Sequence, residues 1–301
     1  MTNENNNSIL IGDSLELLKT IPDNSIHMIL SDIPYGIGLD EWDILHNNSN
    51  SAYHGSSPAQ EKAGKVFKKR GKPINGWSDA DKNIPKEYYD WCMKWLPECH
   101  RVLKPGGSIM IFAGRRFAHR CICAIEDSGF NFRDLLGWKR GRAVHRAQRL
   151  SVVFSRRNDI PNERKWDGWR LGNLRPIFEP IIWGFKPYKI TIADNAVEHE
   201  LGAYNQESME KNFGHIDNIF TCDYRSKERG YHEAQKPIDL LRGLIELVTR
   251  EDHVILDPFA GSGSTAVAAM ETNRRFIMIE RDTQYKDVIE NRVKNTDISL
   301  F

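Results

Sequence analysis

The 301-residue sequence has little cysteine and no pattern that would use it. The five cysteines include no Cys-x-x-Cys pair, which argues against a structural zinc site and against a disulfide framework. The start, MTNENNNSIL, has no apolar core flanked by basic residues, so no signal peptide is expected. No uncharged run approaches the roughly 20 residues that span a bilayer. These absences indicate a cytoplasmic globular protein with no membrane partner, built as one domain with insertions or as two domains.

The net charge is also close to zero, because 42 basic residues offset 41 acidic ones. Basic residues are nevertheless in excess in one segment. Residues 139–175 contain eleven Lys or Arg against three Asp or Glu, a local charge of +8. Nine of the eleven are arginine, whose guanidinium can grip phosphate or guanine with two hydrogen bonds. Trp138, Trp166 and Trp169 lie in or beside the cluster and could stack on bases. The alternative is that these basic residues are ordinary surface charges in contact with solvent. The arginine content favours a nucleic-acid surface that includes Lys139, Arg140, Arg142, Arg146 and Arg149.

Short apolar runs alternate with amphipathic segments along most of the chain. Strands are predicted at 8–12, 26–31, 108–113, 176–185, 253–257 and 275–280, and helices at 13–20, 84–103, 115–129, 236–249, 264–272 and 282–295. This alternation predicts an α/β fold with a mostly parallel sheet. Residues 39–83 lose apolar periodicity and are predicted to form a long mobile loop. Residues 187–230 are expected to be irregular and polar.

In the stretch ILSDIPYGIG, residues 29–38, an apolar run ends in side chains that could form a catalytic or binding site. Asp32 places a carboxylate at the strand end, Pro34 stiffens the chain, and Tyr35 offers a flat ring. The alternative is that this segment has no function beyond connecting a strand to the loop that follows it.

A second strand end, in VILDPFAGSGSTAVAAM at 254–270, continues into a loop with Gly261 and Gly263 and then into a helix. This arrangement brings backbone close to a bound nucleotide. Glu280 ends the next predicted strand, where a carboxylate can accept hydrogen bonds from ribose hydroxyls. A tight structural turn is the alternative, but the strand, the helix and Glu280 together favour an adenosine-containing ligand.

Together these segments resemble the DNA amino-methyltransferases, which move a methyl group from S-adenosylmethionine to an exocyclic nitrogen of adenine or cytosine. Their catalytic signature, Asp/Asn/Ser-Pro-Pro-Tyr/Phe/Trp, is similar to Asp32-Ile33-Pro34-Tyr35 except at the second position. Their Phe-x-Gly-x-Gly loop matches Phe259, Gly261 and Gly263, and their His-Pro-x-Gln-Lys-Pro is similar to HEAQKP at 232–237. The catalytic motif precedes the cofactor loop, which is the order of the family's beta class.

The resemblance implies a Rossmann-like methyltransferase fold with a mostly parallel, seven-stranded sheet and a circularly permuted order of motifs. It implies a catalytic domain made of residues 1–138, 176–186 and 231–301, with the loop at 39–83 lying over the target base. The segments 139–175 and 187–230 would be inserted for target recognition.

The resemblance also implies roles for the catalytic residues. Asp32 and the Ile33 carbonyl would accept the two hydrogens of the target amine, and Pro34 would fix the direction of that carbonyl. Tyr35 would stack on a base flipped out of the duplex. S-adenosylmethionine, which becomes S-adenosylhomocysteine, is the implied cofactor, with no metal. The implied cofactor-binding residues are Asp13, Asp32, His232, Gln235, Lys236, Pro237, Asp257, Pro258, Phe259, Ala260, Gly261, Ser262, Gly263, Glu280 and Arg281.

In the family that the sequence resembles, aspartate in the first catalytic position favours adenine N6 over cytosine N4. The expected function is therefore site-specific adenine-N6 methylation of double-stranded DNA, in a bacterium or encoded by a phage. The alternatives are the same chemistry on cytosine N4 or on RNA, and a non-enzymatic nucleic-acid-binding protein with a relic cofactor fold. A cognate restriction endonuclease and a second copy of the chain, forming a homodimer, are candidate partners.

Three further residues receive structural interpretations. Trp91 and Trp95, four residues apart, fit one face of a helix and are expected to pack in the interior. Glu179 is assigned no role in the reaction.

Overall fold

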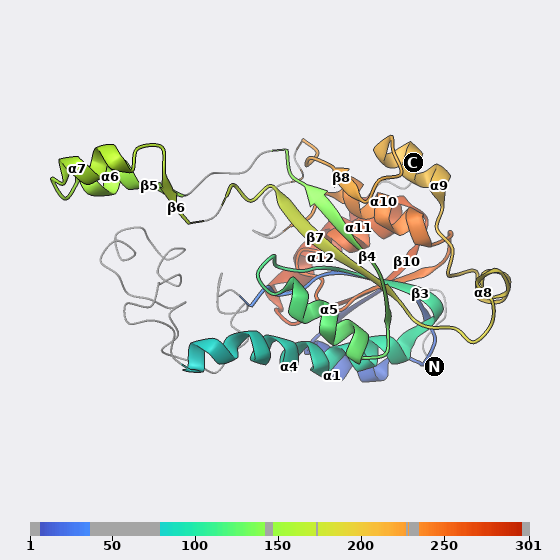
Figure 1. Ribbon diagram of the computed structural model, residues 1–301. Coiled ribbons are helices and arrows are strands. Elements are labelled where there is room, and N and C mark those ends of the chain that lie inside the picture. Colours follow the sequence, from blue (N-terminus) through green and yellow to red (C-terminus); the bar gives the residue numbers. More distant parts are fainter. Residues whose placement is uncertain are drawn as a thin grey trace.

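The computed structural model describes residues 7–36, 79–141, 147–172, 174–226, 228 and 235–296. Its centre is an eight-stranded sheet in the order β1-β10-β9-β2-β3-β7-β4-β8 (Figure 1). The strands are β1 (Ser8–Ile11), β2 (Ile26–Asp32), β3 (Leu103–Phe112), β4 (Asn131–Lys139), β7 (Phe178–Phe185), β8 (Ile219–Thr221), β9 (Val254–Asp257) and β10 (Arg275–Glu280). All pairs from β1 to β3 are parallel, as is β4 with β8, whereas β7 is antiparallel to both neighbours. The predicted α/β class with a mostly parallel sheet is confirmed.

The sheet has one strand more than the predicted seven. Two of its strands, β4 and β8, lie outside the strand ranges predicted from the sequence. Strand β8 lies in the segment 187–230, which also forms α8 (Ile192–His199) and α9 (Gln206–Phe213). The expectation of an irregular segment is therefore wrong. Capping side chains start both helices, Thr191 for α8 and Asn205 for α9, and β8 has Phe220 as its one buried residue. Such short, polar elements have almost no hydrophobic periodicity by which a sequence could reveal them.

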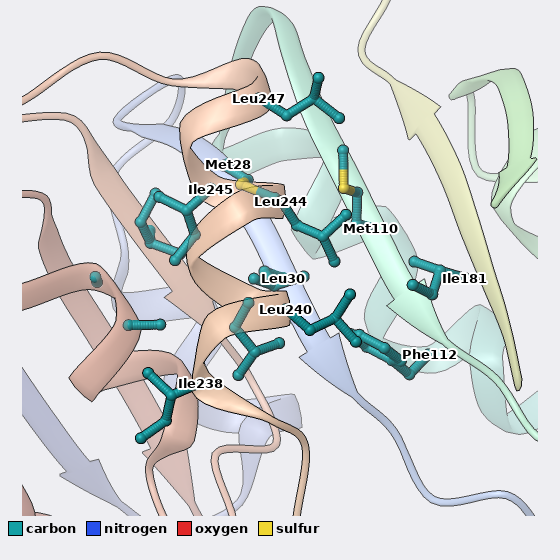
Figure 2. Close-up of a cluster of buried hydrophobic side chains, with 14 of the residues drawn as sticks. Met28, Leu30, Met110, Phe112, Ile181, Ile238, Leu240, Leu244, Ile245 and Leu247 are labelled. Carbon is teal, nitrogen blue, oxygen red and sulfur yellow. The ribbon is translucent and has the colours of Figure 1, made fainter. Parts of the chain in front are cut away.

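Helices cover both faces of the sheet. They are α1 (Ser14–Leu17), the 3₁₀ turn η1 (Leu18–Thr20), α4 (Asp79–Val102), α5 (Ala118–Asp127), α10 (Ile238–Val248), α11 (Ser264–Glu271) and α12 (Gln284–Lys294). Side chains alternate along the buried strands, so Met28 and Leu30 face one layer while Ile29 faces the other. Figure 2 shows the first layer, in which Leu240 and Leu244 of α10 pack over Leu30 and its neighbours. Each such fully buried aliphatic side chain contributes roughly 1.5–3 kcal/mol of transfer free energy.

The opposite layer belongs to α4 and α5. Trp95 and Leu96 of α4 are fully buried with Ile29, Ile109 and Ile111 of the sheet. Tryptophan and aliphatic side chains on one face of a long helix give this layer its apolar area.

The parallel strands bring the predicted chemical groups to one edge of the sheet. Strand β9 lies between β10 and β2, and β1 lies beside β10. The carboxyl ends of these strands carry Asp32, Asp257 and Glu280, with Asp13 just beyond β1. This arrangement places these groups where open α/β sheets bind ligands.

A small unit, called the arm below, consists of β5 (Gln148–Arg149), α6 (Leu150–Ser155), α7 (Ile160–Lys165) and β6 (Arg170–Leu171). It projects away from the sheet in Figure 1, and α6 and α7 bury no residue. Within the predicted mobile loop, residues 79–83 instead begin α4, and the remainder lies outside the described residues. No helix in the described part of the chain is long and apolar enough to cross a membrane.

Candidate active site

The end of β2 sets the backbone of the catalytic motif. Ile33, which replaces the family's proline, is 2 % exposed and packs in the layer beneath α4. Its side chain therefore anchors the motif in the core, while Pro34 restricts Ile33 to extended conformations. Tyr35 follows, and its Cβ lies so close to Gly114 that a side chain there would come within 2.8 Å. The glycine lets the Tyr35 ring lie against the end of β3.

The two carboxylate oxygens of Asp32 differ in their surroundings. Oδ2 accepts a hydrogen bond from Nζ of Lys236 at 2.5 Å. Oδ1 is buried and has no hydrogen-bond partner among the described residues. Burial raises the pKa of Asp32 to about 6, although Lys236 opposes this shift. At neutral pH Asp32 is therefore a carboxylate with one acceptor oxygen available.

Lys236 is itself buried, with 3 % of its side chain exposed. Its ammonium also lies 3.1 Å from Oε1 of Glu179. Burial by itself would lower the pKa of Lys236, but Asp32 and Glu179 raise it above the ordinary value. The cation therefore persists, and it stabilises two carboxylates at once.

Glu179 is the site residue that the sequence analysis missed. Its Oε1 accepts a hydrogen bond from the Tyr35 hydroxyl at 2.5 Å, and its Oε2 accepts one from Arg140. Burial alone would raise the pKa of Glu179, yet Lys236 and Arg140 hold it below the usual range. One signal was present in the sequence, because a glutamate inside the apolar strand FEPIIWGF requires a charged partner when it is buried.

The glycine loop after β9 is held by the carboxylate of Asp257. Oδ1 accepts from the Ser31 hydroxyl at 2.6 Å and from the Phe259 N–H at 3.0 Å, and Oδ2 accepts from the Thr265 hydroxyl at 2.6 Å. Burial raises the pKa of Asp257 to about 6, and these three donors oppose the shift. Asp257 thus joins the end of β2, the loop and the start of α11.

Helix α12 clamps the same loop from outside the sheet. Gly263 has φ +77°, and a side chain there would come within 2.9 Å of Ile289 on α12. The buried Arg292 donates from Nη1 to the Ser262 carbonyl at 2.7 Å and to the Ser264 hydroxyl at 3.2 Å. The loop conformation therefore depends on the last helix as well as on its own glycines.

Glu280 and Asp13 lie at the neighbouring strand ends. Glu280 accepts from the Gly261 N–H at 2.7 Å through Oε2 and from the Asp282 N–H at 2.8 Å through Oε1. Burial raises the pKa of Glu280. Asp13 accepts from the Leu15 N–H at the start of α1. Each carboxylate oxygen has further lone pairs, so both groups can still bind hydroxyls of a ligand.

A cavity of about 390 Å³ joins the catalytic motif to the glycine loop. Of the predicted residues its lining contains Asp13, Asp32, Ile33, Pro34, Tyr35, Gln235, Lys236, Asp257, Pro258, Phe259, Ala260, Gly261, Ser262, Glu280 and Arg281. Pro237 and Gly263 are described but do not line it, and His232 lies outside the described residues.

The cavity also has an aromatic wall that the sequence analysis interpreted as packing alone. Trp91 and Trp95 line the cavity and lie 5.5 Å and 5.2 Å from the Phe259 ring. A carboxylate-bearing, partly aromatic cavity beside an open glycine loop fits a ligand that combines a flat base, a ribose and a positive charge.

The structure describes three of the five predicted DNA-binding residues. Lys139 and Arg149 are exposed, Arg140 is half-buried against Glu179, and Arg142 and Arg146 lie outside the described residues. Trp138 is buried and donates to the Cys222 carbonyl at 2.9 Å, so its predicted contact with bases is wrong. In the arm, Trp169 is 61 % exposed and packs edge-on against Trp166.

The model of the family N6_N4_Mtase, described as DNA methylase, matches residues 26–291. The type II methyltransferase M.HindIII of Haemophilus influenzae is 52 % identical over 93 % of this chain and 93 % of its own length. The chain belongs to the N6/N4 DNA methylase family.

A more distant relative and two solved structures are also similar to this chain, the structures in their fold. The type II methyltransferase M.HinfI of Haemophilus influenzae is 30 % identical, over 96 % of this chain and 68 % of its own. Among solved structures, the cytosine-N4-specific PvuII DNA methyltransferase has a TM-score of 0.64 at 17 % identity, over 98 % of this chain and 90 % of its own. The complex of M1.HpyAVI with S-adenosylmethionine has a TM-score of 0.56 at 18 % identity, over 95 % and 98 % of the two chains.

Family membership confirms the predicted DNA amino-methyltransferase, its DNA substrate and its cofactor, S-adenosylmethionine. The family contains both adenine-N6 and cytosine-N4 enzymes, so the methylated base is decided at a finer level than family membership. In the described part of the methylase, no group of three or more His, Cys, Asp or Glu side chains could hold a metal ion.

The clamp on the glycine loop gives a direct test of the cofactor site. We expect Arg292→Met to raise the Kd for S-adenosylmethionine about tenfold, because the loop loses charge-assisted hydrogen bonds that hold its conformation. Isothermal titration calorimetry measures this change. Lys294→Met removes an exposed cation from the same helix and serves as the matched control. Equal affinities in both variants and the parent would show that Arg292 does not shape the site.

Proposed function

We propose that this methylase transfers the methyl group of S-adenosylmethionine to the exocyclic N6 of an adenine flipped out of double-stranded DNA. The observation that carries the proposal is Oδ1 of Asp32, a buried carboxylate oxygen that has no hydrogen-bond partner among the described residues and belongs to a residue lining the cavity. Buried acceptors are normally satisfied, so an available one at this position suits a substrate donor.

The residues of the motif supply what an exocyclic amine requires. Its lone pair is delocalised into the ring, so the amine is a poor nucleophile until its hydrogens are held out of conjugation. Asp32 accepts one hydrogen through Oδ1, and the Ile33 carbonyl accepts the other. Bound S-adenosylmethionine supplies an electrophilic methyl group on a sulfonium. Asp32, whose pKa burial raises to about 6, then takes up the proton that the methylated amine releases.

The base is positioned by the aromatic part of the site. Tyr35 offers its ring to the flipped base, because its hydroxyl is held by Glu179 and its Cβ rests against Gly114. Alignment of the amine and the methyl group by these fixed groups makes the transfer effectively unimolecular, which lowers its barrier. Pro237 and Gly263 act indirectly, by fixing the start of α10 and the loop before α11.

The choice of adenine over cytosine rests on aspartate in the first position of Asp32-Ile33-Pro34-Tyr35. Cytosine N4 is the second candidate, because the PvuII enzyme with the same fold is cytosine-N4-specific. The likeness to M.HindIII, a type II methyltransferase, supports a bacterial restriction-modification setting in the cytoplasm, with a cognate endonuclease. We also propose that two copies of the chain form a homodimer.

We assign DNA binding to the arm and to the segment 187–230. The exposed basic residues of the arm are Arg149, Arg156, Arg157, Arg164, Lys165 and Arg170. They lie on a projecting unit with Trp169 among them (Figure 1), which suits contact with phosphates and grooves.

The reaction itself is tested by product analysis. The parent protein with tritiated S-adenosylmethionine and unmethylated bacterial genomic DNA is expected to yield N6-methyladenine. We expect Asp32→Ala to lower turnover at least 100-fold, because the lost contact is made to the reacting amine, while cofactor affinity stays within twofold. N4-methylcytosine as the product would decide for the second candidate. Turnover within a few-fold of the parent would remove Asp32 from the mechanism, and single-stranded DNA and RNA serve as competing substrates.

The arm is tested by the salt dependence of DNA binding. Arg149→Gln combined with Arg156→Gln should weaken binding and reduce the slope of log K against log salt by about 1.8, at about 0.9 per phosphate contact. Fluorescence anisotropy with a duplex of mixed sequence measures the slope. Lys94→Gln with Lys294→Gln removes two exposed cations, one in α4 and one in α12, outside the arm and the segment 187–230, and serves as the control. A slope unchanged in the arm variant would place the DNA surface elsewhere.

A further inference from the structure

The carboxylate of Glu179 is contacted by three strong hydrogen-bond donors. It lies in β7 with 5 % of its surface exposed, and the Tyr35 hydroxyl, the Lys236 ammonium and the Arg140 guanidinium all contact it. An isolated buried carboxylate is strongly disfavoured, so these contacts stabilise Glu179. They also fix the three donors, and two of those donors touch the reaction centre.

The first effect concerns Tyr35. The ring is bounded by Gly114 on one side, and its hydroxyl ends on Oε1 of Glu179. Fixing both ends of the side chain leaves one orientation for the ring. A stacking platform that does not have to be ordered when the base arrives reduces the entropy cost of binding.

The second effect concerns the two oxygens of Asp32. The Lys236 ammonium lies between Asp32 and Glu179, at 2.5 Å and 3.1 Å from their oxygens. Because Glu179 draws on the same ammonium, Lys236 stays on the Oδ2 side of Asp32 and does not bridge both of its oxygens. This leaves Oδ1 as the acceptor.

From this geometry we infer that Glu179 is a positioning residue of the methyl-transfer centre. It acts through Tyr35, whose ring it orients, and through Lys236, which it keeps on one oxygen of Asp32. The inference rests on the proposed function, because it concerns the acceptor of the target amine. It holds for adenine and for cytosine, since both present an exocyclic amine.

Electrostatics gives the inference a readout that a purely structural role would lack. The titratable groups that face Asp32 are Lys236, Glu179 and Tyr35, and Arg140 faces Glu179 from the outer side. Transfer needs Asp32 ionised, so turnover falls as the pH drops through the pKa of Asp32. Burial places that pKa at about 6, and the negative charge of Glu179 adds to the increase. Removing the charge therefore lowers the pKa of Asp32.

The test is the pH profile of Glu179→Gln under single-turnover conditions with enzyme in excess. Glutamine keeps an acceptor for Tyr35 but loses the charge that holds Lys236 and raises the pKa of Asp32. We expect the rate constant for transfer at pH 8 to fall at least tenfold, with the acid limb of the profile moved down by on the order of 0.5–1 pH unit. The Kd for S-adenosylmethionine should stay within twofold.

The matched control is Glu271→Gln, which neutralises another buried glutamate that is paired with an arginine, Arg225, outside the cavity lining. This control should lose thermal stability without any shift of the acid limb. If Glu179→Gln leaves both the rate and the acid limb at the parent's values, Glu179 does not position the centre. A rate loss without a movement of the acid limb would also overturn the inference, because it would be the signature of a structural role.

A second variant, Tyr35→Phe, keeps the ring and removes the hydroxyl, which binds Glu179 and also interacts with Asp32, so that the inference stays testable if Glu179→Gln fails to fold. We expect a roughly tenfold slower transfer step with unchanged cofactor affinity. A rate equal to the parent's would overturn the role of Glu179 in orienting the ring. The product formed by the parent is measured separately, so an error in the proposed base and an error in this inference give different results.

Discussion

The active site depends on one buried ammonium that is shared by two carboxylates. Lys236 precedes α10, Asp32 ends β2 and Glu179 lies in β7, so the shared ion pair joins three distant segments at one edge of the sheet. Each of these charges would be costly if buried alone, and together they compensate one another. The arrangement fixes Tyr35 and leaves one oxygen of Asp32 available, which are the two conditions for activating an exocyclic amine.

The cofactor side of the cavity lies at the same edge of the sheet, where the parallel strands end. Asp257 ties the glycine loop to Ser31, one residue before Asp32, so the loop and the catalytic motif are held at a fixed separation. Arg292 holds the outer side of the loop from α12. The glycine loop and the acceptor residues are therefore held in one framework, and alignment of this kind lowers the barrier to transfer.

Local patterns predicted the parts of this framework that follow from strand ends and glycine loops. Asp32, Asp257 and Glu280 were identified because each ends a strand, and Tyr35 and Gly261 because they lie in the loops that follow β2 and β9. Glu179 was missed because its role comes from three partners that only the fold brings together. Trp138 was misread for the same reason, since an indole beside arginines looks accessible until strand β8 covers it. The strand β8 itself escaped because three residues are too short to show a period.

The central claim, that Oδ1 of Asp32 receives the target amine while Lys236 stays on Oδ2, is tested most directly by a crystal structure. The complex should contain S-adenosylhomocysteine and a duplex that carries the sequence the enzyme methylates. The account predicts a flipped base beside Tyr35, its exocyclic nitrogen within hydrogen-bond distance of Oδ1 of Asp32, and Lys236 still between Asp32 and Glu179. A complex in which Lys236 has left Asp32 and the amine lies on Oδ2, or in which the base stays stacked in the duplex, would contradict it.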